Sequence, residues 1–345
     1  MKAIAYEAFG TADVLELKEV PKPEVGPDEV LVRVRAASAN PYDWHVMRGL
    51  PYVARLMGVG LRKPKDSVLG TDVAGDVEAV GKAVTRLRPG DDVFGFVGAG
   101  SFAEYVTAPE KLLALKPGNL SAEQAATVPL AATTALQGLR DVGEIRPGQK
   151  VLIVGASGGV GTFAVQIAKW FGADVTAVCS TRNVEMVRAI GADRVIDYTK
   201  EDFTRNGQKY DLIFQLAGTA SPSACRRVLA AKGRLVLSSG DSRGRIIGPV
   251  GRIIKAALLS PFVTQTLRPL LAKPSGDDLQ LLRELIEAGR ITPVIDRTYP
   301  IRDAADAIRY LETGHAKGKV VISVPGPAAP PPATSTATLA GREVS

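Results

Sequence analysis

The segment "VLIVGASGGVGTFAVQIAKWFGADVTAVCSTRN", residues 151–183, decides the fold. An apolar strand runs into a turn with glycines at 155, 158, 159 and 161, a helical stretch follows, and a second apolar strand ends at Ser180. Glycines let the backbone turn tightly and approach a pyrophosphate, whose charge is met by N–H groups and by the N-terminal dipole of the helix. The segment therefore predicts a βαβ unit that binds a dinucleotide.

The end of the second strand indicates which dinucleotide. A unit that prefers NAD carries Asp or Glu there for the ribose 2′-hydroxyl, but this strand ends in Ser180, Thr181 and Arg182. A carboxylate would repel a 2′-phosphate, whereas Ser180 can donate a hydrogen bond and Arg182 can pair with the phosphate through its planar fork. We therefore expect NADP(H) rather than NAD(H).

The chain around this unit shows two different sequence patterns. Residues 1 to about 120 contain short alternating segments such as "EVLVRVRAAS" and "SFAEYVTAP", broken by Gly and Pro, which predicts a mostly β domain. A capping box, Ser121 with Gln124, then opens an Ala-rich stretch. From Val151 onward apolar strands alternate with helical stretches, which predicts a parallel sheet with crossover helices.

The last hundred residues return to mixed structure. "DDLQLLRELIEAG" is typical of an amphipathic helix that ends at Gly289, and "DAADAIRYLETG" predicts another helix, capped by Asp303. "KGKVVISV" predicts a closing strand. The Pro/Ala/Thr-rich residues 325–345 have no apolar periodicity, so we expect a disordered tail there.

Composition excludes several classes of protein. A length of 345 residues favours two domains, and 46% hydrophobic with 23% charged residues is ordinary for a soluble protein. The net charge of +7 is too diffuse to predict a nucleic-acid partner. Two cysteines make neither a disulfide framework nor a four-cysteine zinc site. The first residues lack a secretory pattern and no run of about eighteen apolar residues occurs, so we expect a cytoplasmic protein.

One large class of hydride-transfer enzymes uses a tyrosine with a lysine four residues later, and none of the eight tyrosines has that spacing. The chain instead resembles the medium-chain dehydrogenase/reductase superfamily, above all its zinc-free quinone oxidoreductase, or ζ-crystallin-like, branch. The resemblance covers residues 1 to about 325 and is carried by "NPYDWHVMRG" (40–49), "LGTDVAGDVEAVG" (69–81), "GDDVFGF" (90–96), "GASGGVG" (155–161) and "KGKVVISV" (317–324).

This resemblance implies an α/β fold, with a GroES-like β domain beside a Rossmann doubly wound parallel sheet and the active site in the cleft between them. The implied division is a GroES-like substrate domain (1–122), a Rossmann NADP-binding domain (123–275), a return segment that rejoins the first domain (276–324) and the tail (325–345). It also implies a homodimer, which nothing else in the sequence indicates.

The resemblance also bears on zinc. Zinc enzymes of the superfamily place a cysteine ligand at the start of the first motif and a histidine ligand in the second, where this chain has Asn40 and Thr71. A catalytic zinc takes about three protein ligands, and the only Cys and His residues are Cys179, Cys225, His45 and His315. We expect no metal. Without a Lewis acid to stabilise an alkoxide, quinones or α,β-unsaturated carbonyls become the plausible hydride acceptors.

Such acceptors need hydrogen-bond donors aimed at the developing oxyanion. By resemblance the candidate catalytic residues are Asn40, Tyr42 and Tyr52, with Trp44 as an aromatic wall of the substrate pocket. His45 stands where some relatives carry a proton-relay histidine, so it can return a proton through water. The alternative for the aromatic residues is packing between the domains, and for His45 a solvated surface ring.

The candidate cofactor-binding residues come from the glycine turn, the strand ends and the family pattern. They are Thr134, Gly155, Ser157, Gly158, Gly159, Val160, Gly161, Ser180, Arg182, Tyr198, Leu216, Ala217, Gly218, Ser238, Ser239, Gly240 and Lys319.

Other readings of the sequence stay open. The runner-up activity is a metal-free NADP-dependent alcohol or aldehyde dehydrogenase, and the non-catalytic alternative is an NADPH-binding or RNA-binding crystallin-like protein. No basic stripe interleaved with aromatic residues supports RNA binding. The basic stretch 241–275 is more typical of a lid over the substrate cleft or a subunit contact than of a membrane surface, so we expect no membrane contact.

Overall fold

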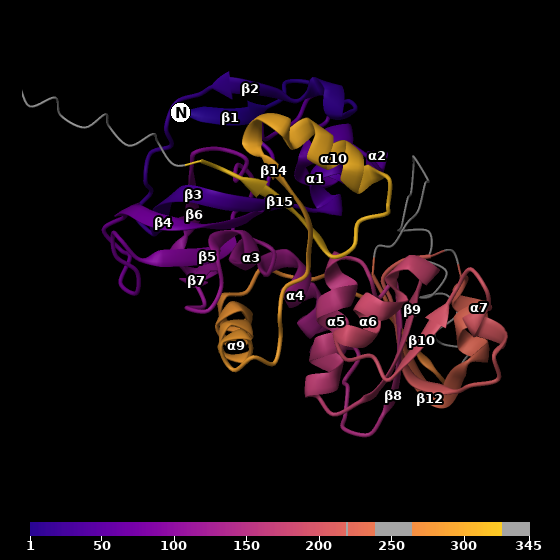
Figure 1. The fold of residues 1–345 in the computed structure, drawn as a ribbon. Helices are drawn as coiled ribbons and strands as arrows, with labels where there is room; N and C mark the ends of the chain where they lie inside the picture. The colour runs from indigo at the N-terminus through magenta and orange to yellow at the C-terminus, as the bar shows by residue number, and fades with distance from the viewer. Residues whose placement is uncertain (219, 239–263, 326–345) are drawn as a thin grey trace, which may run out of the picture.

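The computed structural model describes residues 1–218, 220–238 and 264–325. Within these ranges the chain forms two lobes, each built on its own β-sheet (Figure 1). The expected tail and most of the basic stretch 241–275 lie outside the described residues.

The first lobe holds a seven-stranded, mostly antiparallel sheet in the order β14-β15-β3-β4-β5-β7, with β6 paired to β3, and a separate β1-β2 hairpin. Its elements are β1 (Lys2–Ala5), β2 (Glu16–Glu19), β3 (Glu29–Ala39), α1 (Pro41–Arg48), α2 (Tyr52–Ala54), β4 (Asp72–Val80), β5 (Asp92–Phe96), β6 (Tyr105–Pro109), β7 (Leu113–Leu115), β14 (Ile295–Pro300), α10 (Ala304–Glu312) and β15 (Lys319–Ser323).

The second lobe is the expected parallel sheet, six strands in the order β10-β9-β8-β11-β12-β13 with every pair parallel. Its elements are β8 (Lys150–Val154), α5 (Gly159–Trp170), β9 (Asp174–Cys179), α6 (Val184–Ala189), β10 (Arg194–Asp197), β11 (Tyr210–Gln215), α7 (Pro222–Arg227), β12 (Leu229–Leu237) and β13 (Thr266–Pro269).

Single turns of 3-10 or π-helix connect these elements. They are η1 (Ala12–Val14), η2 (Arg55–Val59), η3 (Glu110–Leu112), η4 (Gly138–Val142), η5 (Thr181–Asn183), η6 (Phe203–Arg205) and η8 (Ile301–Asp303).

Three helices join the lobes: α3 (Ala122–Ala126), α4 (Pro129–Gln137) and α9 (Gly276–Glu287). The capping box is present, because Ser121 Oγ accepts from the Gln124 backbone and Gln124 Oε1 accepts from the Ser121 backbone. The Ala-rich stretch nevertheless divides into two helices, since Pro129 has no N–H for the preceding turn and starts α4 instead. α9 packs on β7 and α4, below the first sheet in Figure 1.

One hydrophobic cluster runs through both lobes. It includes Phe94 of β5, Leu136 of α4 and Phe163 of α5, all fully buried, while a second cluster fills the first lobe and a third lies on the other face of the parallel sheet. The two sheets therefore share a continuous core through α3, α4 and α9 rather than meeting at a polar hinge.

The late helices differ from expectation in detail. α9 begins one residue after Ser275, whose hydroxyl accepts from the Asp278 N–H, and Gly289 follows the helix with φ +67°. Asp303 is the N-cap residue of α10, as expected, but its side chain makes no capping hydrogen bond. The reason is that Asp303 belongs to the single turn η8 and has φ −103°, ψ 19°, instead of the extended backbone that lets an N-cap side chain fold back.

Candidate active site

The glycine turn lies between β8 and α5, as the sequence predicts. Gly155 has φ +89°, a conformation that favours glycine, and a Cβ on Gly161 would lie 2.1 Å from the Gly155 carbonyl oxygen. A Cβ on Gly158 would meet only that same oxygen, at 3.6 Å. Gly158 also caps α5, a twelve-residue helix whose N-terminal dipole faces the turn. Gly161 thus shapes the turn, whereas Gly158 leaves space above it.

That space belongs to a cavity of about 850 Å³ at the carboxyl edge of the parallel sheet. Eight residues expected to bind cofactor line it: Gly155, Ser157, Gly158, Ser180, Arg182, Tyr198, Ala217 and Gly218. The return segment closes one side through residues 314–316, and four charged side chains, Lys200, Glu201, Asp202 and Arg227, lie farther along. The volume, the glycine turn and the carboxyl edge fit a dinucleotide.

Arg182 is held at the rim of this cavity. The side chain is exposed, and its Nη2 donates to the carbonyl oxygen of His315 at 3.1 Å. This bond ties the end of β9 to the return segment. Within the described residues the other guanidinium N–H groups have no acceptor, so they can meet a phosphate. The predicted place for a 2′-phosphate therefore retains a cationic donor.

Asn183, which the sequence analysis did not select, orders both serines of the cavity. Its Nδ2 donates to Ser157 Oγ at 2.9 Å and to Ser180 Oγ at 3.3 Å. Because both hydroxyl oxygens accept from Asn183, their own hydrogens stay available for an anion. The signal was present in the sequence, since Asn183 directly follows Arg182.

The other expected cofactor residues that the structure describes do not line this cavity. Thr134 lies on α4 and donates to the Leu130 carbonyl at 2.6 Å. Gly159, Val160 and Gly161 form the first turn of α5, whereas Leu216 and Ser238 follow β11 and β12 at the carboxyl edge. Ser239 and Gly240 lie outside the described residues.

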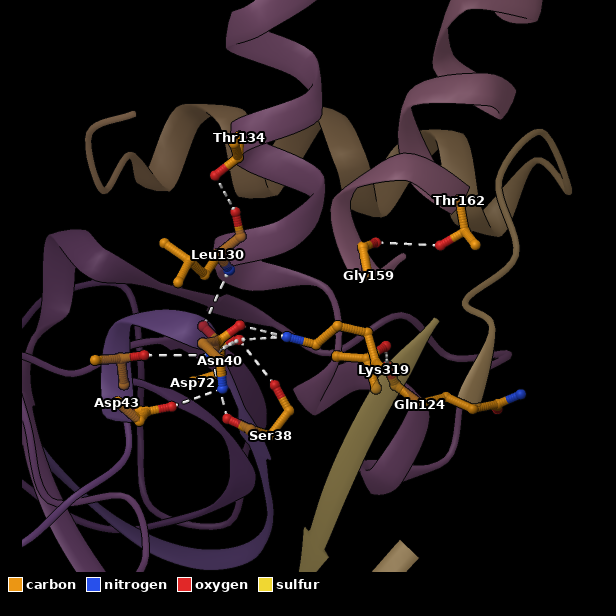
Figure 2. Close-up of polar contacts among 12 residues, drawn as sticks. Ser38, Asn40, Asp43, Asp72, Gln124, Leu130, Thr134, Gly159, Thr162 and Lys319 are labelled. Atoms are coloured by element: carbon orange, nitrogen blue, oxygen red, sulfur yellow. Dashed lines mark hydrogen bonds and ion pairs between the residues drawn. The ribbon is translucent and has the colours of Figure 1, made fainter. Parts of the chain in front are cut away.

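Lys319, expected near the cofactor, lies in a buried polar cluster with Asn40 (Figure 2). Its Nζ donates to Asn40 Oδ1, and the Asn40 Nδ2 donates to the Ser38 carbonyl at 3.2 Å and to Asp72 Oδ2 at 3.0 Å. Asn40 and Lys319 are each 3% exposed. The Asn40 amide is therefore already engaged, and donating to a substrate oxygen would require breaking one of these bonds.

Asp72 is the second residue that sequence analysis missed, although it lies inside the quoted motif "LGTDVAGDVEAVG". It is fully buried and accepts hydrogen bonds from Ser38 Oγ, the Asn40 amide and the Leu130 N–H, and Lys319 Nζ lies 3.5 Å away. Burial without solvent lowers the pKa of Lys319, and the nearby Asp72 carboxylate opposes that shift.

Asp43 lies in the first turn of α1 with Tyr42 and Trp44, and its pKa is shifted far from the ordinary value. Burial raises its pKa to about 7, although the Asn40 backbone N–H donates to its Oδ2 at 2.7 Å. The nearby Asp72 carboxylate acts in the same direction as burial, because two neighbouring negative charges repel.

The aromatic candidates come from α1 and α2. Trp44 and His45 stack at 3.6 Å between ring centroids, and Trp44 also packs on the core of the first lobe. His45 Nδ1 donates to the Leu50 carbonyl, which leaves Nε2 as the free ring nitrogen, and burial lowers its pKa. Tyr42 and Tyr52 are about half exposed, at 51% and 46%.

The structure thus joins Asn40 with Lys319 and Trp44 with His45. None of the aromatic candidates lines the large cavity. Tyr42 instead borders a separate space of about 10 Å³ with Tyr6 and Asp43, and the Arg55 guanidinium lies 4.9 Å from the Tyr52 ring. Across the described part of the chain, no group of three or more His, Cys, Asp or Glu residues is arranged to hold a metal ion. Over the same residues, no helix is long and apolar enough to cross a membrane.

Two family models match the chain. Residues 26–118 match the alcohol dehydrogenase GroES-like domain, and residues 190–322 match a zinc-binding dehydrogenase model.

Curated relatives align over nearly the whole chain. A chloroplastic NADPH-dependent alkenal/one oxidoreductase of Arabidopsis thaliana is 37% identical over 93% of this chain and 79% of its own length. A chloroplast envelope quinone oxidoreductase homolog of the same plant is 33% identical over 93% of this chain and 98% of its own length.

Solved structures have the same architecture. The quinone oxidoreductase of Coxiella burnetii superposes with a TM-score of 0.80 at 32% identity, covering 94% of this chain and 99% of that one. The Escherichia coli quinone oxidoreductase complexed with NADPH gives a TM-score of 0.81 at 25% identity, covering 94% and 100%.

Proposed function

The chain belongs to the quinone oxidoreductase branch of the medium-chain dehydrogenase/reductase superfamily, and from this premise we propose that it transfers hydride from NADPH to a quinone or an α,β-unsaturated carbonyl. The observation that carries the proposal is the cavity beside the parallel sheet, where the glycine turn, Ser180 and Arg182 converge. NADPH, when bound, supplies the hydride; the residues of this chain bind and orient it.

The roles proposed for the cofactor-binding residues follow from the geometry, and those proposed for the acceptor side follow from the family resemblance. Gly158 leaves room for the pyrophosphate at the N-terminus of α5, and Ser180 and Arg182 bind the 2′-phosphate. Trp44 orients the acceptor, and Tyr42 and Tyr52 donate to its oxygen. A lowered pKa keeps His45 neutral near pH 7, so we assign it a relay of protons through water at Nε2 rather than direct donation.

We also propose that the reaction proceeds without zinc. The positions at which zinc relatives place their cysteine and histidine ligands are Asn40 and Thr71, and the Lys319 ammonium donates to Asn40 Oδ1. An ammonium at that point repels a divalent cation and supplies no ligand for it.

The test is NADPH consumption by purified protein treated with a chelator, measured against a panel of quinones, enones and aldehydes. We expect turnover with a quinone or an enone and no change when zinc is added. Turnover with aldehydes alone would support a metal-free alcohol or aldehyde dehydrogenase instead. Activity that appears only after zinc addition would contradict the zinc-free mechanism, and NADPH binding without any turnover would favour a non-catalytic protein.

We propose the domain division 1–122, 123–275 and 276–324. It is supported by the parallel sheet, which uses residues 150–269, and by β14 and β15, which join the sheet of the first lobe. The cytoplasmic location and the absence of nucleic-acid and membrane partners stay predictions; the names of two relatives place those proteins in the chloroplast.

A homodimer is proposed through the edge of the parallel sheet. Among the described strands β13 is the last in the order of its sheet, and an edge strand presents N–H and C=O groups to a partner strand. Light scattering coupled to size-exclusion chromatography should give twice the chain mass. Replacing Leu267 of β13 by Pro removes one backbone donor, so we expect a shift to the monomer, and an unchanged dimer would exclude this edge as the contact.

A further inference from the structure

We propose that Asp72 is a positioning residue of the active site: its buried carboxylate, paired with Lys319, fixes Asn40 on the substrate side relative to the glycine turn on the cofactor side. The inference rests on the proposed hydride transfer, because it concerns the alignment of the two reactants.

Asp72 receives donors at both carboxylate oxygens (Figure 2). Oδ1 accepts from the Leu130 N–H at 3.0 Å. Oδ2 accepts from Ser38 Oγ at 2.9 Å and from Asn40 Nδ2 at 3.0 Å, and the ammonium of Lys319 lies 3.5 Å from it. No part of Asp72 is exposed.

These donors come from three separate segments of the chain, residues 38–40, α4 and β15. Ser38 is the penultimate residue of β3 and Asn40 caps α1, whereas Leu130 lies in the first turn of α4 and Lys319 begins β15. The carboxylate meets α4 at its N-terminus, where the helix dipole favours negative charge. One helical turn later, Thr134 donates to the Leu130 carbonyl, so the position of α4 also sets that of Thr134.

Lys319 extends this connection to the glycine turn. Its Cδ lies 2.9 Å from the point that a Cβ on Gly159 would occupy, so the side-chain stem packs directly on the start of α5. The preceding residue, Gly318, donates its N–H to the Ser157 carbonyl at 2.8 Å. Lys319 therefore connects the cluster around Asn40 to the loop that forms the pyrophosphate site.

Stability alone does not explain a buried ion pair at this point. Removing two charges from water offsets most of their attraction, and a well-packed apolar pair is often as stable. The charged pair fixes the orientation of the surrounding side chains, because each donor must point at a defined carboxylate oxygen. Neither Asp72 nor Lys319 lines the cavity, so the pair acts through Asn40, α4 and the glycine turn rather than by touching the reactants.

Hydride transfer is sensitive to such alignment, since reacting atoms must approach to about 3–3.5 Å and a misplacement of about 1 Å can lower the rate about 100-fold. In Asp72→Asn the shape of the side chain is kept and its charge removed. We expect kcat with the best quinone or enone of the panel to fall about 10- to 100-fold. The dissociation constant of NADPH, measured by fluorescence, should change far less, and the primary isotope effect on kcat with 4-deuterated NADPH should rise.

Asp76→Asn is the matched control. Asp76 lies on the same strand, is 7% exposed and pairs with Arg33 and Arg35, and none of these three residues lines the cavity. We expect this variant to lose stability while its kcat and isotope effect stay those of the wild type.

The double variant Asp72→Leu/Lys319→Met separates positioning from folding. It replaces the ion pair by apolar side chains, so stability should recover while kcat stays low. Wild-type kcat in a folded Asp72→Asn protein, or recovery of both stability and kcat in the double variant, would overturn the proposal. If Asp72→Asn does not fold, the double variant decides. Failure of the proposed function is distinct from these outcomes, since the wild-type protein itself would then turn over no acceptor.

Discussion

At the scale of single residues, the residues that follow β9 line the cofactor cavity, and the first residue of β15 belongs to the buried cluster around Asn40. Ser180 and Arg182 line the cavity and are steered by Asn183 and the His315 carbonyl, whereas Lys319 is withdrawn from it into the cluster around Asp72. An exposed cationic side chain, Arg182, is thus proposed to bind the ligand, whereas a buried one, Lys319, is proposed to hold Asn40 in position.

Arg182→Ala tests the choice of cofactor. Loss of one charge-assisted contact to a phosphate, about 1.5 kcal/mol, should weaken NADPH about tenfold while NADH changes little. Titration of both nucleotides by fluorescence measures the difference. Arg188→Ala is the control, because Arg188 pairs with Glu185 on the exposed face of α6. An equal loss of affinity for both nucleotides would show that Arg182 acts only by holding the return segment.

Asp43 should make stability depend on pH. The folded protein keeps the Asp43 proton up to about pH 7, whereas the unfolded chain releases it near the ordinary pKa of 3.8. The folded state therefore binds more protons in this window, and the free energy of unfolding falls as pH rises from about 4 to about 7.

Urea unfolding at a series of pH values measures this slope. Asp43→Asn retains an acceptor for the Asn40 N–H but cannot ionise, so its free energy of unfolding should fall less across the same window. Parallel slopes for the two proteins would contradict the raised pKa.

At the scale of elements, the turn from β8 to α5 contains one glycine that the packing of the turn requires and another that borders the cofactor cavity. Gly161 has no room for a side chain, because its Cβ would overlap the Gly155 carbonyl oxygen, whereas Gly158 opens toward the cavity and has φ −82°, which alanine also adopts. Packing of the turn therefore requires glycine at position 161, whereas access of the ligand favours glycine at position 158.

Gly158→Ala and Gly161→Ala should consequently behave differently. We expect Gly158→Ala to keep the melting temperature of the ligand-free protein and to lose at least about tenfold in NADPH affinity, since a methyl group fills the approach to the pyrophosphate. Gly161→Ala should lower the melting temperature itself. Calorimetry with and without NADPH checks both, and a stable Gly161→Ala protein with normal affinity would contradict the packing.

At the scale of the whole molecule, the site depends on contacts between segments far apart in sequence. The return segment reaches the cofactor cavity through residues 314–316, pairs with the glycine turn through Gly318 and joins the first sheet through β15. The continuous core through α3, α4 and α9 holds both sheets in one cooperative unit.

NADPH should therefore stabilise the entire described fold and not the parallel sheet alone. At a concentration 100 times the dissociation constant, the gain is about 2.7 kcal/mol, enough to raise the melting temperature by a few degrees. We expect a single transition that moves upward as a whole in calorimetry, with a smaller shift for Gly158→Ala at the same NADPH concentration. Two transitions, of which only one moves, would show that the lobes unfold independently.

Local patterns were sufficient to predict the parallel sheet, the glycine turn, the capping box at Ser121 and the position of Arg182 at the cavity. Each depends on residues close together in the chain, because alternation, turn chemistry and strand ends are short-range properties. Asn183 was within reach of the same reasoning, since it is one residue beyond Arg182.

The tertiary structure alone decided what surrounds Asn40. Asp72 and Lys319 are separated from each other by 247 positions, and only the antiparallel pairing of β15 with β3, and of β3 with β4, brings them to one buried point. The family resemblance could place Lys319 near the cofactor. It could not reveal that the Lys319 ammonium is buried beside the Asp72 carboxylate. The interactions of a buried charged group depend on the protein groups that replace its hydration shell. The tertiary structure determines which groups these are.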